Sequence, residues 1–230
     1  MEVKRKNLLF CICVGCIIVL VIISLLAGIN HRVGRTAIQV QITPTQPVVS
    51  LTFDDGPNSY YTPQVLDILY KQQVPATFFL VGEKLDGNEL LIREMEASGH
   101  EIECHTFSHP DLTTLNNQQI QQEIHKTEDK LKKILPDYSI NYVRPPYGRY
   151  TKEVEEAINL PLALWTIDSE DWENPDAERI YTAVVDNIQD GDIIVFHDNN
   201  IETVNALKKI IRELKAKKYQ FVTVSHLLDK

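Results

Sequence analysis

Hydrophobic and polar positions follow two different periodicities along the chain from residue 48 onward. Short runs rich in β-branched and aromatic residues predict strands, whereas apolar positions spaced three or four residues apart predict helices. The predicted strands cover residues 48–53, 76–81, 101–104, 142–143, 162–167, 192–196 and 220–224. The predicted helices cover the region around 65–69 and residues 90–97, 120–135, 152–158, 177–188 and 204–217.

Strands and helices therefore alternate through the whole segment, without internal repeats or low-complexity tracts. Such alternation is typical of an α/β fold, in which helices cover a parallel sheet. About seven predicted strands fall within fewer than 200 residues. This density favours a compact, irregular (β/α) barrel over an open sheet.

The N-terminal segment has a different pattern, because Lys4-Arg5-Lys6 precede a run without charged residues from 8 to 29. About 20 apolar residues cross a bilayer as a helix. A cleavable signal peptide is the alternative, but its apolar region is usually shorter, about 7–15 residues, and ends in a small-x-small site. Residues 24–28 give no good match to such a site.

We therefore expect a cytoplasmic N-terminus at 1–7, a transmembrane signal-anchor at 8–29, a linker at 30–47 and one domain at 48–230. The positive-inside rule places the N-terminus in the cytoplasm. The domain is then extracytoplasmic and tethered to the cell membrane by a single pass.

The net charge of the chain limits the kinds of partner that it can bind. The formal net charge is −9. The first 47 residues hold five Lys or Arg and one Glu, so the remainder is more acidic, at −13. Such a domain is unsuited to binding nucleic acid through phosphates. Three of the four cysteines lie in the apolar run, which leaves Cys104 without a partner for an internal disulfide and predicts that it packs in the core.

In (β/α) barrels the functional residues lie at the C-terminal ends of the strands. Five of the predicted strands are followed by ionisable side chains, which would converge on one face of the domain. The residues concerned are Asp54 and Asp55, His105 and His109, Arg144, Asp168 and Asp171, and His197 and Asp198.

Two of these groups have the composition of a metal site. Adjacent carboxylates at a strand end are costly to desolvate unless a cation binds them, although Asp-Gly-Pro can also form a solvated turn. His105 and His109 are four residues apart, which places them side by side on a helical turn, although both could be exposed in a loop. Two imidazoles and one carboxylate leave coordination positions open for water, as a catalytic metal site requires. Taken together, these groups favour the metal site.

The motifs TFDDGP, HTFSHP, RPPYG, DSEDW and IIVFHD occur in this order between Thr52 and Asp198. They resemble the motifs of the polysaccharide deacetylase family (the NodB-homology domain), and in particular those of peptidoglycan N-acetylglucosamine deacetylases. Residues 221–224 resemble the last strand of that family. The resemblance implies a distorted, incomplete (β/α) barrel. It also implies an enzyme that removes acetyl groups from N-acetylated sugars in peptidoglycan, chitin or a related polymer.

Carried over residue by residue, the resemblance assigns a role to each motif. Asp55, His105 and His109 would bind a divalent metal ion, with Zn²⁺ the leading candidate and Co²⁺ or another divalent ion as alternatives. The remaining assignments are Asp54 as general base, Arg144 as its orienting partner, His197 as general acid paired with Asp168, and Pro145, Pro146, Tyr147 and Trp172 as the lining of the substrate groove. The backbone N–H of Tyr147 would help to hold the oxyanion.

This assignment agrees with the chemistry of amide hydrolysis. A metal ion supplies an activated nucleophile and polarises the carbonyl, a carboxylate accepts the proton of water, and a protonated imidazole donates to the departing amine. The predicted substrate is an N-acetylated cell-surface polysaccharide, with peptidoglycan favoured because the tether is short; no protein partner is evident. Three alternatives stay open: an O-deacetylase acting on acetylated xylan, a wall-binding protein without turnover, and a metal-dependent phosphoesterase.

Overall fold

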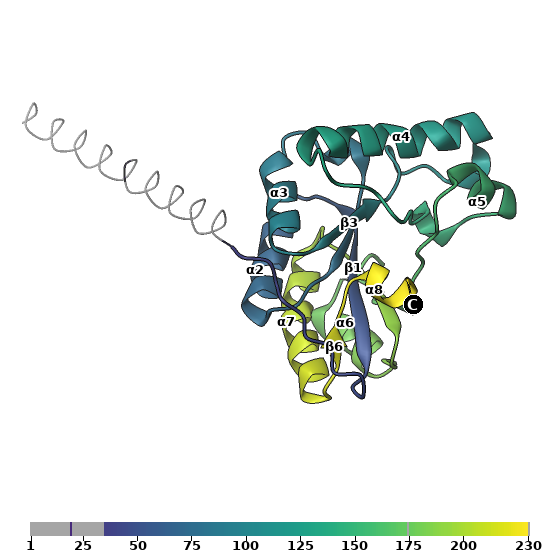
Figure 1. The fold of residues 1–230 in the computed structure, drawn as a ribbon. Helices are drawn as coiled ribbons and strands as arrows, with labels where there is room; N and C mark the ends of the chain where they lie inside the picture. Colours follow the sequence, from purple (N-terminus) through teal and green to yellow (C-terminus); the bar gives the residue numbers. More distant parts are fainter. Residues whose placement is uncertain (1–18, 20–34, 174, 230) are drawn as a thin grey trace, which may run out of the picture. The chain divides into compact units, whose positions relative to one another are not determined.

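The structure, a computed structural model, describes Val19, residues 35–173 and residues 175–229 (Figure 1). The chain divides into two units, Met1–Thr36 and Ala37–Lys230, and the second unit contains the sheet. The predicted signal-anchor at 8–29 lies outside the described residues, apart from Val19. Among the helices of the described part, none is long and apolar enough to cross a membrane.

Residues 37–47, which the sequence assigns to the linker, form no helix or strand but contact the domain. Ile38 is buried, and its N–H donates to the carbonyl of Ser98 over 2.9 Å. The side chain of Gln220 accepts from the N–H of Thr43 over 2.6 Å and donates to the carbonyl of Thr43 over 2.9 Å. These bonds place the start of the domain near residue 37.

The described residues form a six-stranded sheet in which all pairs of neighbouring strands are parallel. Its order is β3-β2-β1-β5-β4, and β6 pairs with β1. The strands are β1 (Val48–Gly56), β2 (Thr77–Leu80), β3 (Glu101–Cys104), β4 (Ile167–Asp168), β5 (Asp192–His197) and β6 (Gln220–Phe221). The α-helices are α2 (Thr62–Gln72), α3 (Glu89–Ala97), α4 (Asn117–Ile134), α5 (Lys152–Ile158), α6 (Ala177–Val185), α7 (Ile201–Ala216) and α8 (Val224–Leu228). The predicted α/β fold with a parallel sheet is thus confirmed.

The predicted strand 142–143 is only an isolated bridge, and the predicted strand 162–167 is a bridge at Leu162 and a regular strand only from Ile167. Val143 pairs with Cys104 on one side and with Leu162 on the other, and the segment that follows becomes regular only at β4. Nearby prolines explain the interruption, because Pro145 lies two residues after Val143 and Pro161 directly precedes Leu162, and neither proline can donate to a ladder. The bridges nevertheless carry the pairing from β3 towards the segment before β4, which pairs with β5.

The predicted last strand, 220–224, was too long. Only β6 is a strand, and the chain then enters α8. Two side chains of the sheet accept hydrogen bonds from the start of this helix. The hydroxyl of Thr77 accepts from the N–H of Val224 over 2.9 Å, and the carboxylate of Glu101 accepts from the N–H of Ser225 over 3.3 Å. Satisfied N–H groups and an acid at its N-terminus stabilise a short helix here.

The two faces of the sheet differ in composition, because alternate residues of a strand point to opposite faces. On one face, the ring of Phe53 stacks on those of Phe78 and Phe196, with centroids 5.1 and 5.6 Å away. They belong to a large core that includes residues of α2, α3 and α7 (Figure 1). Fully burying such a side chain contributes roughly 1.5–3 kcal/mol. The other face carries the buried polar residues Ser50, Thr52, Asp54, Thr77, Glu101 and Glu103, beside a small apolar cluster of Phe79, Tyr142, Ala163, Ile193 and Val224.

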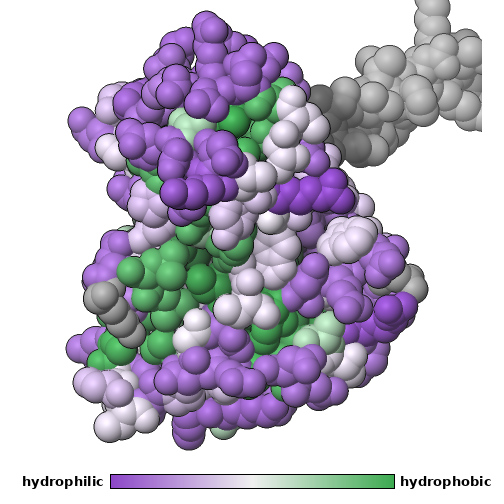
Figure 2. Space-filling view, turned by 90° about the vertical axis from the view of Figure 1, so that its right-hand side faces the viewer, coloured by the Kyte–Doolittle hydropathy of each residue, from purple (hydrophilic) through white to green (hydrophobic). Residues whose placement is uncertain are grey.

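The longest helix of the domain, α4, has clear terminal signals. The side chain of Asn116 accepts from the N–H of Gln119, and the side chain of Gln119 accepts from the N–H of Asn116, which forms a capping box. Lys132 and Lys133 lie in the last turn, where their positive charges interact favourably with the negative end of the helix dipole. Figure 1 places α4 and α5 at the top of the domain. In Figure 2 this upper part is largely hydrophilic, and hydrophobic residues gather in a hollow below it.

Candidate active site

The predicted site residues meet around one cavity of about 470 Å³. The parallel register of β1 and β5 places Asp54 opposite His197, so the proposed base and acid start from neighbouring positions. The cavity is lined by Asp54, Asp55, His105, His109, Tyr147, Arg149, Trp165, Asp168, Trp172, Val195 and His197.

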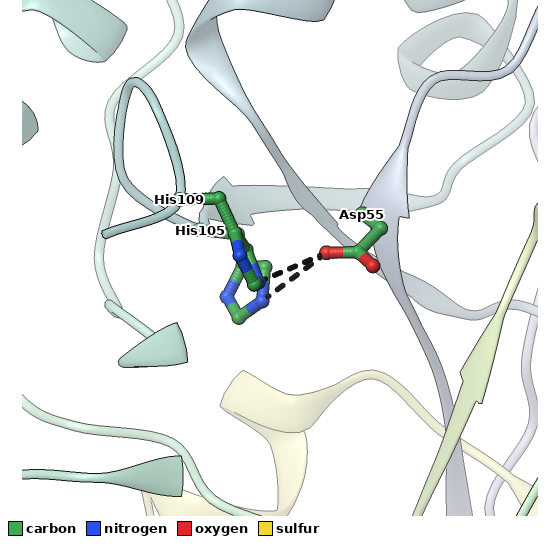
Figure 3. A group of neighbouring side chains, drawn as sticks. All are labelled: Asp55, His105 and His109. Carbon is green, nitrogen blue, oxygen red and sulfur yellow. Dashed lines mark ion pairs between the residues drawn. The ribbon is translucent and has the colours of Figure 1, made fainter. Parts of the chain in front are cut away.

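The three predicted metal ligands converge (Figure 3). Oδ1 of Asp55 lies 3.2 Å from Nε2 of His109 and 3.6 Å from Nε2 of His105. One candidate ligand atom from each residue lies within 4.8 Å of the others. Two atoms that each bind a tetrahedral ion at about 2.0–2.1 Å lie about 3.4 Å apart. The two distances from Asp55 to the imidazoles are close to this value, so these atoms could share one metal ion.

Hydrogen bonding and burial set the protonation state of this donor set. Nδ1 of His105 lies 2.7 Å from the carbonyl oxygen of Arg144, which can only accept, so Nδ1 carries the proton and the lone pair of Nε2 faces Asp55. Burial lowers the pKa of His105, more than the neighbouring carboxylates Asp54 and Asp55 raise it. Burial alone would raise the pKa of Asp55, but the hydrogen bond with His109 and the electrostatic effect of the surrounding histidines hold it well below its usual range. The site therefore presents a carboxylate and a neutral imidazole as ligands.

Non-glycine residues with positive φ cluster at the site. Asp55, Thr106, His109 and Tyr147 have φ values of 67°, 66°, 59° and 61°. Such conformations cost of order 1–3 kcal/mol each and persist only where the surroundings fix them. The N–H of Thr106, for example, donates to Sγ of Cys104 over 3.3 Å. Cys104 itself packs in the core as predicted, and burial raises the pKa of its thiol to about 12.

The predicted partnership of Asp54 and Arg144 is present. Nη1 of Arg144 donates to Oδ1 of Asp54 and to the hydroxyl of Thr52, both over 2.7 Å. Its Nε donates to the carbonyl of Ala163 over 2.8 Å, and its guanidinium stacks on Phe79, 3.9 Å from the ring centroid. Because these contacts fix Oδ1 of Asp54, Oδ2 is left facing the candidate metal ligands, 3.9 Å from Nε2 of His105.

The predicted pairing of Asp168 with His197 is wrong. Nδ1 of His197 lies 2.7 Å from Oδ1 of Asp171, whose Oδ2 also accepts from the backbone N–H of His197 over 2.8 Å. Asp168 instead accepts from the N–H of Glu170 over 2.8 Å and from Nε1 of Trp172 over 3.3 Å. The reason is local, because Glu170 has a φ of 58° and the chain turns there, which brings the later aspartate to His197.

Asp171 gives His197 the character of an acid. Burial by itself lowers the pKa of His197, but the hydrogen bond and charge of Asp171, with the charges of Asp54 and Asp55, outweigh burial and raise it to about 9. Asp171 is 1% exposed and also accepts from the hydroxyl of Thr203 over 2.6 Å. The imidazole therefore has a fixed orientation, with Nε2 available to a substrate.

The groove differs in part from the prediction. Tyr147 and Trp172 line the cavity and are 59% and 60% exposed, so both rings are accessible to a ligand. Pro145 and Pro146 are buried and are not among the described residues that line it. Their role is to shape the turn that presents Tyr147, whose ring lies 4.8 Å from that of His109.

Sequence reasoning missed Trp165 and Arg149, which also line the cavity. The sequence alone did not point to Trp165, but in the structure this residue lies against Gly148. The φ of Gly148 is 64°, and a Cβ at this position would lie 2.8 Å from Cη2 of Trp165. Arg149 follows the RPPYG motif directly and pairs with Asp111 over 3.1 Å, so its position beside the motif was the signal available.

Comparison with known proteins identifies the family. Residues 41–164 match a family described as polysaccharide deacetylase. A peptidoglycan-N-acetylglucosamine deacetylase of Bacillus cereus is 36% identical over 196 residues, which cover 82% of this chain and 91% of that protein. The peptidoglycan-N-acetylglucosamine deacetylase PgdA of Listeria monocytogenes is 35% identical over 204 residues, 87% of this chain and 44% of that protein. The chain thus spans less than half the length of the Listeria relative.

The fold agrees with this result. The solved structure of the peptidoglycan deacetylase PdaC of Bacillus subtilis aligns with a TM-score of 0.79 at 37% identity, over 82% of this chain and 93% of that one. The family match includes the metal-ligand candidates and Arg144, whereas His197 lies beyond it. This chain belongs to the polysaccharide deacetylase family.

Proposed function

We propose that this chain is a metal-dependent deacetylase. It hydrolyses the N-acetyl group of N-acetylglucosamine-type residues in a cell-surface polysaccharide, with peptidoglycan as the leading substrate, and releases acetate. The observation that carries the proposal is the convergence of Asp55, His105 and His109 with Asp54 and His197 on one cavity. The names of the relatives from Bacillus and Listeria support peptidoglycan as the polymer.

The ligands would be Asp55, His105 and His109, and two imidazoles with one carboxylate suit Zn²⁺, with Co²⁺ or another divalent ion as alternatives. When bound, such an ion polarises the acetyl carbonyl and lowers the pKa of water. The irregular barrel typical of the family would account for the bridges around Val143 and for the gathering of these groups at the strand ends.

The residues of the chain would then move two protons. Oδ2 of Asp54 accepts one from the attacking water, while Arg144 holds the other oxygen of the carboxylate. The water oxygen bonds to the acetyl carbon, and the C–N bond breaks as Nε2 of His197 donates a proton to the departing nitrogen. Asp171 keeps His197 protonated and oriented. The backbone N–H of Tyr147, at the turn beside His109, would donate to the oxyanion.

The test is acetate release by the purified full-length chain, loaded with Zn²⁺, from peptidoglycan, chitin oligomers and acetylated xylan in parallel. We expect release from peptidoglycan, and its loss in His109→Ala together with bound metal. Release from acetylated xylan alone would favour an O-deacetylase, and no release from any polymer by the metal-loaded chain would favour a wall-binding protein without turnover.

We also propose that residues 8–29 anchor the chain in the cell membrane with the domain outside. The cationic Lys4-Arg5-Lys6 and the apolar run support this topology. Protease added to intact cells should then remove the domain. A shortened protein released into the medium would contradict the anchor.

A further inference from the structure

The loop between the two histidine ligands is short and conformationally demanding. His105 follows β3 directly, and only three residues separate it from His109. Thr106 and His109 both have positive φ. Figure 3 shows both imidazoles turned from this loop towards Asp55. Because an isolated segment would rarely adopt these dihedrals, neighbouring elements must hold the loop.

One carboxylate on α4 accepts three hydrogen bonds from this loop. Oε2 of Glu123 accepts from the backbone N–H of Phe107 over 2.9 Å and from that of Ser108 over 2.7 Å. Oε1 of Glu123 accepts from the hydroxyl of Ser108 over 3.0 Å. Both oxygens are therefore engaged with the residues between the ligands. Hydrogen bonds to an ionised carboxylate are stronger than those between neutral groups.

Other contacts of the same helix hold the loop from the side. Nζ of Lys126 and Nζ of Lys130 lie 5.3 and 5.2 Å from the centre of the Phe107 ring. The short segment Gly82–Lys84 also contacts the loop, because the N–H of Glu83 donates to the carbonyl of Phe107 over 2.9 Å. The backbone of the loop is thus bonded by two segments, and Glu123 supplies the only carboxylate bonded to Phe107 or Ser108 among the described residues.

We propose that Glu123 is a positioning residue for the metal site: it fixes the loop so that His105 and His109 face Asp55 before a metal binds. This inference rests on the proposed metal-dependent function. Outer-shell partners of metal ligands typically contribute roughly 10- to 100-fold to metal affinity. Glu123 acts one step further out, through the backbone of the loop. We expect Glu123→Gln to lower the metal affinity by about 10-fold or more.

Glutamine has the same shape but cannot replace the carboxylate. Its single oxygen can accept either from the two backbone N–H groups or from the hydroxyl of Ser108, but not from both. Its amide N–H₂ group then faces the remaining donor. Ser108→Ala is the milder change, because it removes only the hydroxyl bond and leaves both backbone bonds in place. Glu128→Gln is the matched control, since Glu128 lies on the same helix and its carboxylate pairs with Lys132 and His125 at the surface.

The first measurement is the Zn²⁺ affinity of the full-length chain, by competition with a chromophoric chelator. We expect affinity to fall in the order wild type, Ser108→Ala, Glu123→Gln, and Glu128→Gln to equal wild type. Thermal unfolding of the metal-free proteins shows whether the global fold is affected. Equal Zn²⁺ affinity in Glu123→Gln and wild type would overturn the proposal, as would an equal loss in Glu128→Gln.

The second measurement needs no metal. In the metal-free chain, amide hydrogen exchange of a peptide covering residues 105–110 should be faster in Glu123→Gln than in wild type, because the N–H groups of Phe107 and Ser108 lose their acceptor. Unchanged exchange overturns the role of Glu123 by itself. Failure of the wild type to bind Zn²⁺ would instead contradict the proposed metal-dependent function, so the two failures are distinguishable.

Discussion

On β1, Leu51 and Phe53 pack into the core beneath the helices, whereas Thr52 and Asp54 lie on the other face of the sheet and both bond to Arg144. The first face is continuous and apolar, and its side chains need only the right size and shape. On the second face each buried polar group requires a specific partner. The same strands thus supply a generic core on one side and the groups of the candidate active site on the other.

Two carboxylates on the second face show how those requirements are met. Asp54 and Glu103 lie at the same level of the sheet, because both are paired in register with Phe79 of β2. Asp54 has the guanidinium of Arg144 as its partner. Glu103 accepts from the N–H groups of Asn141 and Tyr142 over 2.9 and 2.8 Å, and burial raises its pKa to about 8. The charge of Asp54 is thus neutralised by a guanidinium, which leaves the carboxylate ionised and able to accept a proton. Glu103 instead avoids a buried charge by holding a proton.

The largest expected effect is that of Asp54→Asn. This change keeps the shape and the acceptor for Arg144 but removes the proton acceptor for water, so kcat should fall by about 10²–10⁴. Bound metal, measured by elemental analysis, should be unchanged because Asp55, His105 and His109 remain. Since removing one partner of a buried ion pair can cost roughly 3–5 kcal/mol, the rate is measured on the folded fraction.

The matched control is the neighbouring residue on the apolar face. Phe53→Leu should lower the free energy of unfolding by order 1–2 kcal/mol and leave kcat of the folded protein near that of wild type. Near-normal turnover by metal-loaded Asp54→Asn would remove Asp54 from the role of base. A large fall in kcat for Phe53→Leu would remove the distinction between the two faces.

Asp171→Asn should have a smaller effect on the rate and a distinctive effect on its pH dependence. A raised imidazole pKa keeps His197 protonated to higher pH, so activity is lost as the pH rises through that value, which is about 9 in the structure. Without the charge of Asp171, the alkaline limb of kcat/KM should move to lower pH, with kcat reduced near neutrality.

Asp168→Asn sharpens this test, because Asp168 lines the same cavity but bonds to Glu170 and Trp172. The alkaline limb of kcat/KM for Asp168→Asn should lie at the same pH as that of the wild type. A limb that moves in Asp168→Asn and not in Asp171→Asn would restore the pairing that the sequence suggested. Metal content is measured in both variants, so that loss of the ion is not mistaken for loss of the acid.

The sequence predicted the apolar face better than the polar one. Periodicity located β1, β2, β3 and β5 to within a few residues, because a buried parallel strand is a short continuous apolar run. The positions directly after the predicted strands 48–53 and 192–196 then identified Asp54, Asp55 and His197. Segments whose regularity depends on tertiary contacts were missed or overextended, such as the bridge at Val143 and helix α8, whose first N–H groups are bound by side chains of other strands.

The partner of His197 could not be chosen from sequence alone. Asp168 and Asp171 are three residues apart after the same strand, and both are plausible by position. The choice depends on Glu170, a non-glycine residue at a φ of 58°, and such a conformation leaves no compositional signal. The resemblance to the family predicted that an aspartate near this position pairs with His197. The hydrogen bonds that distinguish Asp171 from Asp168 could be seen only in the folded structure.

The smallest expected effect is that of Glu103→Gln, which should leave activity unchanged and alter only the pH dependence of stability. The pKa of Glu103 is about 8 in the folded protein against an ordinary value of 4.5. Between these values the folded chain holds one more proton at this site than the unfolded chain, so the free energy of unfolding falls as the pH rises. Glutamine keeps an oxygen for the N–H groups of Asn141 and Tyr142 and has no proton to lose.

Urea unfolding at a series of pH values should therefore show the two proteins alike at about pH 4, below the ordinary pKa of Glu, and Glu103→Gln increasingly the more stable up to about pH 8–9. Asp198, whose pKa burial raises to about 7, gives a dependence of the same sign, but it is present in both proteins and cancels in the difference. Glu156→Gln is the control, because Glu156 is exposed on α5 and pairs with Lys152 at the surface, so its difference from wild type should not grow with pH. A flat difference for Glu103→Gln would mean that Glu103 is ionised in the folded protein. The polar face would then hold a second carboxylate balanced by something other than a proton.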